Sequence, residues 1–384
     1  MNPPPPFTDT WTRRDFVRAT AAAAAGGPLL AGAVPSSAAA ATRPRWPGYD
    51  DALVVDFLGS PGYFNYPGNP PLDDVMVRNA LDSGITAMNV TVSGGDFAST
   101  ARRIGEWMAN LDRYPEAFRQ ARTVADVRSA KAAGQMGIVL GFQDTTPLDG
   151  DLANLDVWHD YGVGVIQLTY NVRNLVGDGC LEPANAGLSR YGHAVVERMD
   201  ELRILVDLSH CGKRTTADGI RASSRPVAIT HSGCNAVARH PRSKDDEDLR
   251  AMAEGGGVVG IYLMPFLSPG RAARLDDVVA HIEHALNVCG EDHVGIGSDL
   301  STTPIPDSDE YWTAHRQFVS GRIARGVAAP NEDPDILFNV VDINEPRRLE
   351  RIADALAAKG HPDRVVGKVI GGNWVRVLEE VWGE

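Results

Sequence analysis

The stretch Leu205–Arg242 reads LVDLSHCGKRTTADGIRASSRPVAITHSGCNAVARHPR. It contains two short apolar runs, at 205–208 and 227–230, separated by a polar, helix-compatible segment of crossover length. This pattern predicts a strand, a helix and a second strand parallel to the first. His210 and His231 then lie just past the carboxyl ends of the two strands. Because neighbouring parallel strands are about 4.8 Å apart, both imidazoles can converge on one metal ion.

Arg242 lies on the loop that follows His231. Its planar guanidinium is suited to hold a carboxylate through two parallel hydrogen bonds. The alternative for the histidines is that they are simply polar residues that end two strands. Taken alone, the stretch leaves both interpretations open.

The rest of the chain repeats the alternation of strand and helix from residue 42 onward. Eight apolar, strand-like runs are present, at 52–56, 86–90, 137–141, 165–168, 205–208, 227–230, 258–263 and 294–297. Helix-like segments occur at 73–83, 115–133, 188–202, 245–254, 275–289, 345–358 and 373–382. Residues 301–335, rich in Pro and Asp, are expected to form a long loop or insertion.

Short strands of this kind between helices indicate a parallel sheet covered on both faces. Eight repeats within about 250 residues predict an α/β fold, a (β/α)8 TIM-like barrel. The polar residues at its strand ends, given below, are those that a barrel of the metal-dependent hydrolase type would need. A doubly wound open sheet is the alternative. In such barrels the reacting groups lie at the carboxyl ends of the strands. The polar residues expected there are Asp56, Gln143, Asp144, Tyr170, Asn171, His210, His231 and Asp299.

Composition excludes several classes of partner. The 384 residues carry a formal net charge of −13 and contain no basic run, so nucleic acid and anionic membrane surfaces are not expected partners. The four cysteines form no CxxC pair and are too few for a disulfide scaffold, although pairing between them stays open.

Residues 1–41 have the layout of a cleavable signal peptide. Thr12–Arg18 reads TRRDFVR, which resembles the twin-arginine export signal, and an Ala/Gly-rich apolar stretch and a small-residue run up to Ala41 follow. The apolar part is too short and too rich in Ala and Gly for a stable membrane span. We therefore expect export through the twin-arginine pathway, to a periplasmic or extracellular location, and a single mature domain at 42–384.

Eight motifs in this order resemble the membrane dipeptidase (renal dipeptidase-like) family of zinc peptidases. They are GVIQLTYNVRN (164–174), GLSRYG (187–192), VDLSH (206–210), THS (230–232), HPR (240–242), GGGVVG (255–260), HVGIGSD (293–299) and IGGNWVRVLEEV (370–381). They span nearly the whole mature chain. The resemblance implies a (β/α)8 barrel that hydrolyses dipeptides.

The resemblance also assigns roles to residues. His210 and His231 match metal-binding histidines of the family, and Arg242 matches the arginine that holds the substrate carboxylate. Asp299 matches the aspartate beside the metals, a ligand or general base. Tyr170 stands where the family has a histidine near the scissile carbonyl, and we expect it to bind the substrate and stabilise the oxyanion.

Three further positions depart from the family pattern. The HxD pair after the first strand falls near Leu58 and Ser60, and the glutamate that bridges two metals falls at Gln143, a weaker and neutral ligand. We therefore expect at most one zinc per chain, held by His210 and His231 with Gln143 and Asp299 as further ligands.

Three functions fit this pattern. The first is an exported metal-dependent dipeptidase-like hydrolase that acts on a small peptide or amide. The second is a divergent member that acts on another small carboxylated amide, and the third is a catalytically inactive binding protein. A homodimer is compatible with each. His281 and His284, three apart on one expected helix, are interpreted as a solvated helix face.

Overall fold

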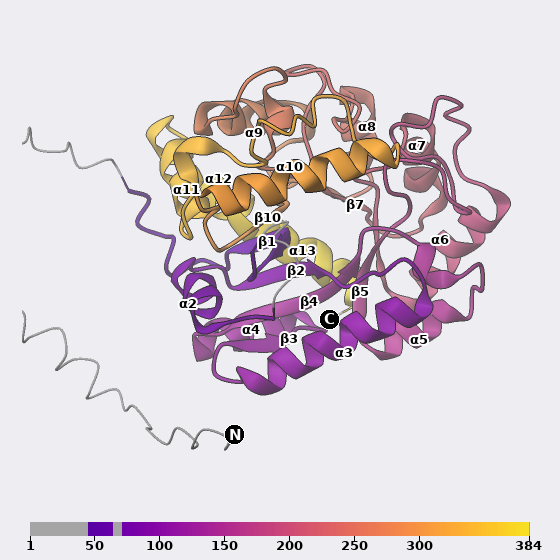
Figure 1. Cartoon of the computed structure of the whole chain (residues 1–384), viewed down its shortest axis with the longest axis horizontal. Helices are drawn as coiled ribbons and strands as arrows, with labels where there is room; N and C mark the ends of the chain where they lie inside the picture. The colour runs from indigo at the N-terminus through magenta and orange to yellow at the C-terminus, as the bar shows by residue number, and fades with distance from the viewer. Residues whose placement is uncertain (1–44, 64–70, 384) are drawn as a thin grey trace, which may run out of the picture. The chain divides into compact units, whose positions relative to one another are not determined.

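The computed structural model describes residues 45–63 and 71–383, so the expected signal peptide at 1–41 lies outside the described residues. All eight expected strands are present. They are β1 (Val55–Ser60), β2 (Ala87–Thr91), β4 (Met136–Phe142), β5 (Val163–Gln167), β6 (Leu205–Asp207), β7 (Ala228–Ser232), β8 (Val258–Ile261) and β9 (Val294–Ile296). They pair in parallel in this order along the chain, as the (β/α)8 prediction requires (Figure 1).

Helices alternate with these strands. They are α2 (Asp74–Asp82), α3 (Phe97–Arg113), α4 (Val124–Ala133), α5 (Asn154–Asp160), α6 (Arg190–Leu202), α7 (Lys213–Ala222), α8 (Asp246–Glu254), α9 (Leu275–Cys289), α10 (Asp309–Ala324), α11 (Arg348–Ala358), α12 (Asp363–Gly367) and α13 (Asn373–Leu378). Within the described part of the chain, no helix is both long and apolar enough to cross a membrane.

The ring of strands closes through a short break in the last strand. After β9, three residues lead to β10 (Leu300–Ser301), which pairs in parallel with β1. The buried carboxylate of Asp56 accepts hydrogen bonds from the backbone N–H of Ser298 (2.7 Å) and from its hydroxyl. Asp56 is therefore a closing contact of the barrel, and it does not belong to the polar ring expected at the site.

The amino-terminal end of the barrel is filled by the C-terminal helix. Trp374 of α13 stacks on Phe57 with ring centroids 4.1 Å apart, and its indole N–H donates to the carbonyl of Ile296 (2.9 Å). Val377 and Leu378 join the same buried cluster, together with the first residues of several strands. Figure 1 shows α13 in the middle of the ring. Because this end is packed with apolar side chains, only the carboxyl end is free for chemistry.

One expectation about local structure was wrong, and a second was correct only in one of its alternatives. The expected helix at 115–133 is the strand β3 (Phe118–Gln120) followed by α4, and β3 pairs with the amino-terminal half of β4. A three-residue strand is too short to show the alternation that would identify it. The segment 301–335, expected to be a long loop or insertion, is an insertion that contains the helix α10, whose first turn is capped by the Ser308 hydroxyl. Its apolar residues do not form one stripe, so the sequence pattern did not reveal it.

The expectation for His281 was also wrong. This side chain is fully buried. Its Nδ1 accepts a hydrogen bond from the backbone N–H of Cys234 (2.9 Å), and its Nε2 lies 3.2 Å from the carbonyl oxygen of Leu267. His281 therefore fixes the loop after β7 against α9, and it does not lie on a solvated face.

Candidate active site

Two imidazoles face each other at the carboxyl end of the barrel. His210 follows β6 by three residues, as expected, while His231 lies inside β7 as its penultimate residue and not just past it. Both side chains are buried, and their Nε2 atoms are 2.9 Å apart. The convergence that the sequence predicted is thus present in the structure.

Hydrogen bonds at the opposite ring nitrogens determine the tautomer of each histidine. The Asn171 amide donates to the carbonyl of Val327 (2.8 Å), which directs its Oδ1 toward His210 Nδ1 at 2.6 Å. Because Oδ1 can only accept, His210 carries its proton on Nδ1. Its Nε2 therefore presents a lone pair to His231.

His231 is held in the same way from the other side. The Thr230 hydroxyl donates to the carboxylate of Asp207 (2.7 Å), so its oxygen accepts from the Nδ1–H of His231 at 2.8 Å. Asp207 also accepts hydrogen bonds from the backbone N–H groups of Ser209 (2.9 Å) and Thr230 (3.0 Å). The Nε2 of His231 then also carries a lone pair and no proton, so the two Nε2 lone pairs face one another across 2.9 Å.

This arrangement suits a shared cation. Burial lowers the pKa of both imidazoles well below the usual value, and the nearby Arg242 guanidinium lowers it further. A proton between them is thus disfavoured near neutral pH, whereas a metal ion accepts both lone pairs at once. Two imidazole nitrogens on one tetrahedral zinc lie about 3.3 Å apart, close to the observed separation.

Gln143, another ligand of the expected set, lies close to His231. Its Nε2 lies 3.5 Å from His231 Nε2. Rotating the amide by half a turn would put its oxygen in that place. Among residues 45–63 and 71–383, no three His, Cys, Asp or Glu side chains gather as a metal-binding group. The residues present thus fit one ion through two imidazoles and an amide, and the metal role of Asp299 stays a prediction.

A cavity of about 590 Å³ opens beside this pair. Leu58, Ser60, Gln143 and Asp299 all line it, and helix α3 forms its outer wall. The two positions where the family pattern has His and Asp therefore do face the same space as Gln143. Neither Leu58 nor Ser60 offers a charged or imidazole ligand for a second ion; of the described residues that line this cavity, only Asp299 and Glu106 carry a carboxylate.

Asp299 lies at the point where the last strand breaks. Its backbone φ of 56° falls in the left-handed region, which is uncommon for a residue with a side chain. Its backbone N–H donates to the carbonyl of Leu58 (2.8 Å), which holds this conformation. Burial raises the pKa of its carboxyl to about 7, although the Arg242 and Arg322 guanidinium groups act in the opposite direction. A carboxyl with this pKa can exchange a proton near neutral pH.

Tyr170 lies directly against the histidine pair. Its ring stacks on His210 with centroids 4.0 Å apart. Arg322 of α10 donates a hydrogen bond to the Tyr170 hydroxyl (3.3 Å) and is itself paired with the buried carboxylate of Glu332. The segment that contains α10, expected to be a long loop or insertion, thus supplies a cation to the site.

Arg242 is almost completely buried, with 2% of its surface exposed. Its guanidinium donates to the backbone carbonyls of Ser209 (2.7 Å) and His231 (3.2 Å). These bonds use two of its five N–H donors. The arginine therefore ties the loop after β6 to β7 next to both histidines, and its role as carboxylate ligand stays a prediction.

Other polar residues at this end have structural partners. Asp144 accepts hydrogen bonds from the backbone N–H (2.7 Å) and the hydroxyl (2.6 Å) of Thr146, so its carboxylate is engaged in its own turn. All four cysteines are free thiols, and Cys211 and Cys234 are buried among apolar side chains.

The residues that orient the histidines were not predicted from the sequence. Asn171 was named only as a polar strand end, and Asp207, Thr230, Arg322 and Glu332 were not singled out. The available signals were Asp207, three residues before His210, and Thr230, directly before His231. The contribution of α10 could not be inferred, because it depends on a contact between residues 152 positions apart.

Comparison with known proteins agrees with this geometry. The family model described as membrane dipeptidase (peptidase family M19) matches residues 85–325. The dipeptidase verJ of Clonostachys rogersoniana is 30% identical over 71% of this chain and 68% of its own length. A solved structure of an amidohydrolase from Pseudomonas aeruginosa is 32% identical to this chain. The match covers 88% of this chain and 98% of the amidohydrolase chain, with a TM-score of 0.75.

A more distant solved structure supports the fold alone. It is a metallo peptidase from Rhodobacter sphaeroides liganded with a phosphinate mimic of the dipeptide L-Ala-D-Ala. This peptidase is 18% identical to the present chain. The match covers 85% of the present chain and 99% of the peptidase chain, with a TM-score of 0.67. Taken together with the barrel and the facing histidines, the family match shows that this chain belongs to the membrane dipeptidase family, peptidase family M19, a family of dipeptidase-like metal-dependent hydrolases.

Proposed function

We propose that this chain is an exported hydrolase that cleaves the amide bond of a dipeptide or a similarly small carboxylated amide. The observation that carries the proposal is the pair of Nε2 lone pairs that face each other at 2.9 Å, with both tautomers fixed from behind. This is the arrangement that a metal-dependent hydrolase needs, because ligating histidines keep their orientation through hydrogen bonds at the other ring nitrogen.

The proposed metal is a single zinc ion, between zero and one per chain as isolated. His210 and His231 would hold it, with Gln143 as a neutral third ligand. When bound, such an ion polarises an amide carbonyl and lowers the pKa of water. Asp299 lines the adjoining cavity, and we assign it a separate task.

We assign proton transfer to Asp299. With a pKa of about 7, its carboxylate can take a proton from the attacking water at neutral pH and return it to the leaving amine. The strained backbone at this residue fixes the direction of the side chain relative to the cavity.

We assign oxyanion stabilisation to Tyr170. Arg322 lies with its guanidinium carbon 5.6 Å from the centre of the Tyr170 ring and bonds to the hydroxyl. A cation at this position makes the phenol a stronger donor to an oxygen that gains negative charge. Arg242, with N–H donors left over, would hold the substrate carboxylate close to the histidines.

The test is a combined measurement on mature protein purified from its own export pathway. We expect up to one zinc per chain and hydrolysis of members of a dipeptide panel, lost in Asp299→Asn with the metal retained. Turnover only of other carboxylated amides would select the second function. Metal-free protein that binds such ligands without turnover under any loading condition would identify an inactive binding protein and contradict the proposal.

A further inference from the structure

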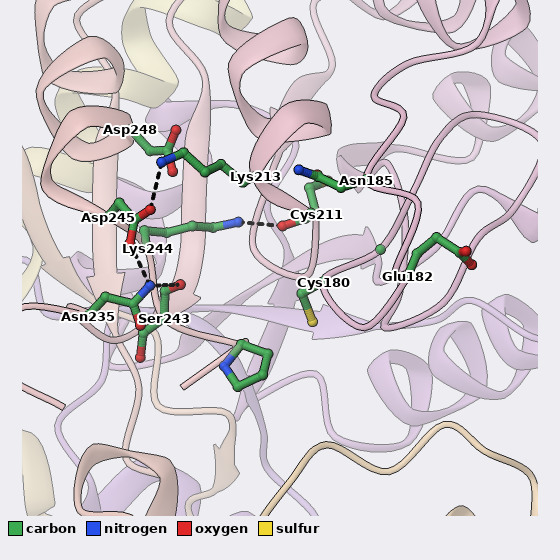
Figure 2. Close-up of a pocket in the computed structure, with 13 residues that line it drawn as sticks. Cys180, Glu182, Asn185, Cys211, Lys213, Asn235, Ser243, Lys244, Asp245 and Asp248 are labelled. Atoms are coloured by element: carbon green, nitrogen blue, oxygen red, sulfur yellow. Dashed lines mark hydrogen bonds and ion pairs between the residues drawn. The ribbon is translucent and has the colours of Figure 1, made fainter. Parts of the chain in front are cut away.

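A second cavity, of about 240 Å³, lies among the loops that follow β5, β6 and β7 and the first turn of α8 (Figure 2). We call it the Lys244 pocket, after the most buried charged side chain in its wall; Cys180, Asn235, Ser243 and Asp248 also line it. It shares no lining residue with the cavity beside the histidines. None of the roles assigned above to catalysis uses it.

Lys244 carries a buried positive charge without a carboxylate partner. Only 4% of its surface is exposed. Its ammonium donates to the carbonyl of Cys211 (2.8 Å) and to the hydroxyl of Thr216 (2.9 Å), and Figure 2 shows it directed at the Cys211 carbonyl. An ammonium has three N–H donors, so one remains available. In the part of the chain that the structure describes, no ion pair includes Lys244.

Asp248 carries a buried negative charge in the same wall. It belongs to the first turn of α8, and 5% of its surface is exposed. Among the described residues, nothing donates a hydrogen bond to its carboxylate. The neighbouring Lys213 pairs instead with Asp245 (2.9 Å) and Glu247 (3.6 Å).

Lys244 and Asp248 attract one another, but they do not meet in an ion pair. Burial of either charge without a partner is costly. An anion alone would leave Asp248 unpaired, and a metal cation would be repelled by Lys244. A ligand that carries both charges a short distance apart would pair both residues.

We propose that the Lys244 pocket binds a small zwitterion of the free amino acid class, with its carboxylate on Lys244 and its ammonium on Asp248. The pocket of about 240 Å³ is smaller than sites for drug-sized ligands, which span about 300–1,000 Å³. This volume agrees with a ligand of the size of a small amino acid. The Asn235 side chain, which donates to Asp245 (2.8 Å) and to the Ser243 carbonyl (3.2 Å), gives the pocket a rigid polar wall. This inference goes beyond the proposed function and does not depend on turnover.

The experiment is calorimetric titration of the full chain, after treatment with a chelator, with glycine, L-alanine, acetate and methylammonium. Acetate and methylammonium each carry one of the two charges. We expect glycine and L-alanine to bind at least tenfold more tightly than either. Acetate that binds as tightly as glycine, or no binding of glycine at millimolar concentration, would overturn the proposal.

Two substitutions locate the binding. Asp248→Asn removes one charge at nearly constant shape, and we expect it to reduce glycine affinity to the level of acetate while acetate affinity is unchanged. Lys244→Gln should weaken both. Asp299→Asn, in the other cavity, is the matched control and should change neither. Loss of glycine binding in Asp299→Asn together with full binding in Asp248→Asn would place the ligand at the catalytic site and refute the inference. If Lys244→Gln does not fold, Asp248→Asn still decides the matter.

Discussion

The Nε2 atoms of His210 and His231 lie 2.9 Å apart, and neither nitrogen carries a proton when both Nδ1 atoms donate to their partners. Such a pair is repulsive unless a cation lies between the nitrogens. The energetic cost of this repulsion is balanced by the hydrogen bonds at the two Nδ1 atoms. His210 donates to Asn171, and His231 donates to Thr230, which is itself held by Asp207. The barrel therefore holds a preformed two-nitrogen site, and its properties depend on residues that do not touch the ion.

The first prediction concerns Thr230. Thr230→Val keeps the shape of the side chain but removes the oxygen that accepts from His231 Nδ1–H. We expect metal affinity to fall by roughly 10–100-fold, because partners behind ligating histidines contribute on this scale. Competition titration with a zinc chelator measures the change. Thr169→Val is a matched control, since this buried hydroxyl contacts Cys211 Sγ (3.4 Å) and no histidine. Equal losses in the two variants would refute the assigned role.

The second prediction concerns the pH dependence of stability in the metal-free protein. The pKa of Asp299 is raised to about 7 in the folded state, whereas an unfolded Asp titrates near 3.9. Between these values the folded chain holds a proton that the unfolded chain has released. The free energy of unfolding therefore falls as pH rises through this window, by up to about 1.4 kcal/mol per pH unit, and levels off above it.

The Asn side chain in Asp299→Asn cannot ionise, so this variant should lack the pH dependence of the free energy of unfolding that Asp299 contributes. Urea denaturation of both proteins from pH 4 to 8 measures the difference, and the variant should gain stability relative to the original chain above pH 7. Parallel curves for the two proteins across the whole range would show that Asp299 is not buried as a neutral acid.

The sequence predicted the architecture because the information is local. Each barrel strand is a short apolar run, and pairing in chain order follows from the right-handed strand–helix–strand unit. His210 and His231 were found because each stands at a strand end, and strand ends converge in a barrel. The same rule named Asn171 as a polar strand end, but it did not predict the hydrogen bond between Asn171 and His210.

The remaining parts of the site depend on contacts distant in the sequence. Arg322 bonds Tyr170 from an inserted helix whose apolar residues show no stripe. Arg242 is buried against the carbonyls of Ser209 and His231, and the left-handed backbone of Asp299 lies where the barrel closes onto β1. Neither feature leaves a pattern in the residues nearby. Asp56 was misassigned for the same reason: only the closure reveals that its partner is Ser298.

The third prediction concerns Arg242. Its guanidinium bonds two backbone carbonyls and lies beside both histidines. Arg242→Ala should weaken binding of a carboxylate-bearing dipeptide by about 2–5 kcal/mol, because a desolvated charge partner is lost. Arg242→Lys should recover only part, since an ammonium cannot reproduce the fork. Calorimetry with a dipeptide and its amidated analogue measures the effect. If the original chain binds both equally, Arg242 does not hold the carboxylate.

The export signal gives the fourth prediction. The TRRDFVR segment ahead of the Ala/Gly-rich stretch motivates it. We expect cleavage near Ala41 and loss of export when Arg13 and Arg14 are both replaced by Lys, which keeps the charge but removes the pair of guanidinium groups. Cell fractionation and N-terminal sequencing measure both effects. Exported protein that still begins at Met1 would contradict this prediction.

The last prediction concerns the number of metal ions. Leu58 and Ser60 lie two residues apart on β1, and both line the cavity with Gln143. The variant Leu58→His, Ser60→Asp, Gln143→Glu would supply an imidazole and two carboxylates there. Two divalent ions about 3.5–4 Å apart repel strongly, and an anionic bridge offsets this repulsion. We expect the triple variant to bind two zinc ions per chain, against one at most in the original protein.

The single variant Gln143→Glu is the matched control. It adds the charge of the bridge without the two further ligands, so it should bind one ion more tightly and still hold no second one. Elemental analysis after dialysis against buffered zinc measures all three proteins. Two tightly held ions in the original chain would show that Leu58, Ser60 and Gln143 do not occupy the family's ligand positions. One ion in the triple variant, with its fold intact by circular dichroism, would show that the backbone of β1 cannot present the new ligands to the histidine pair.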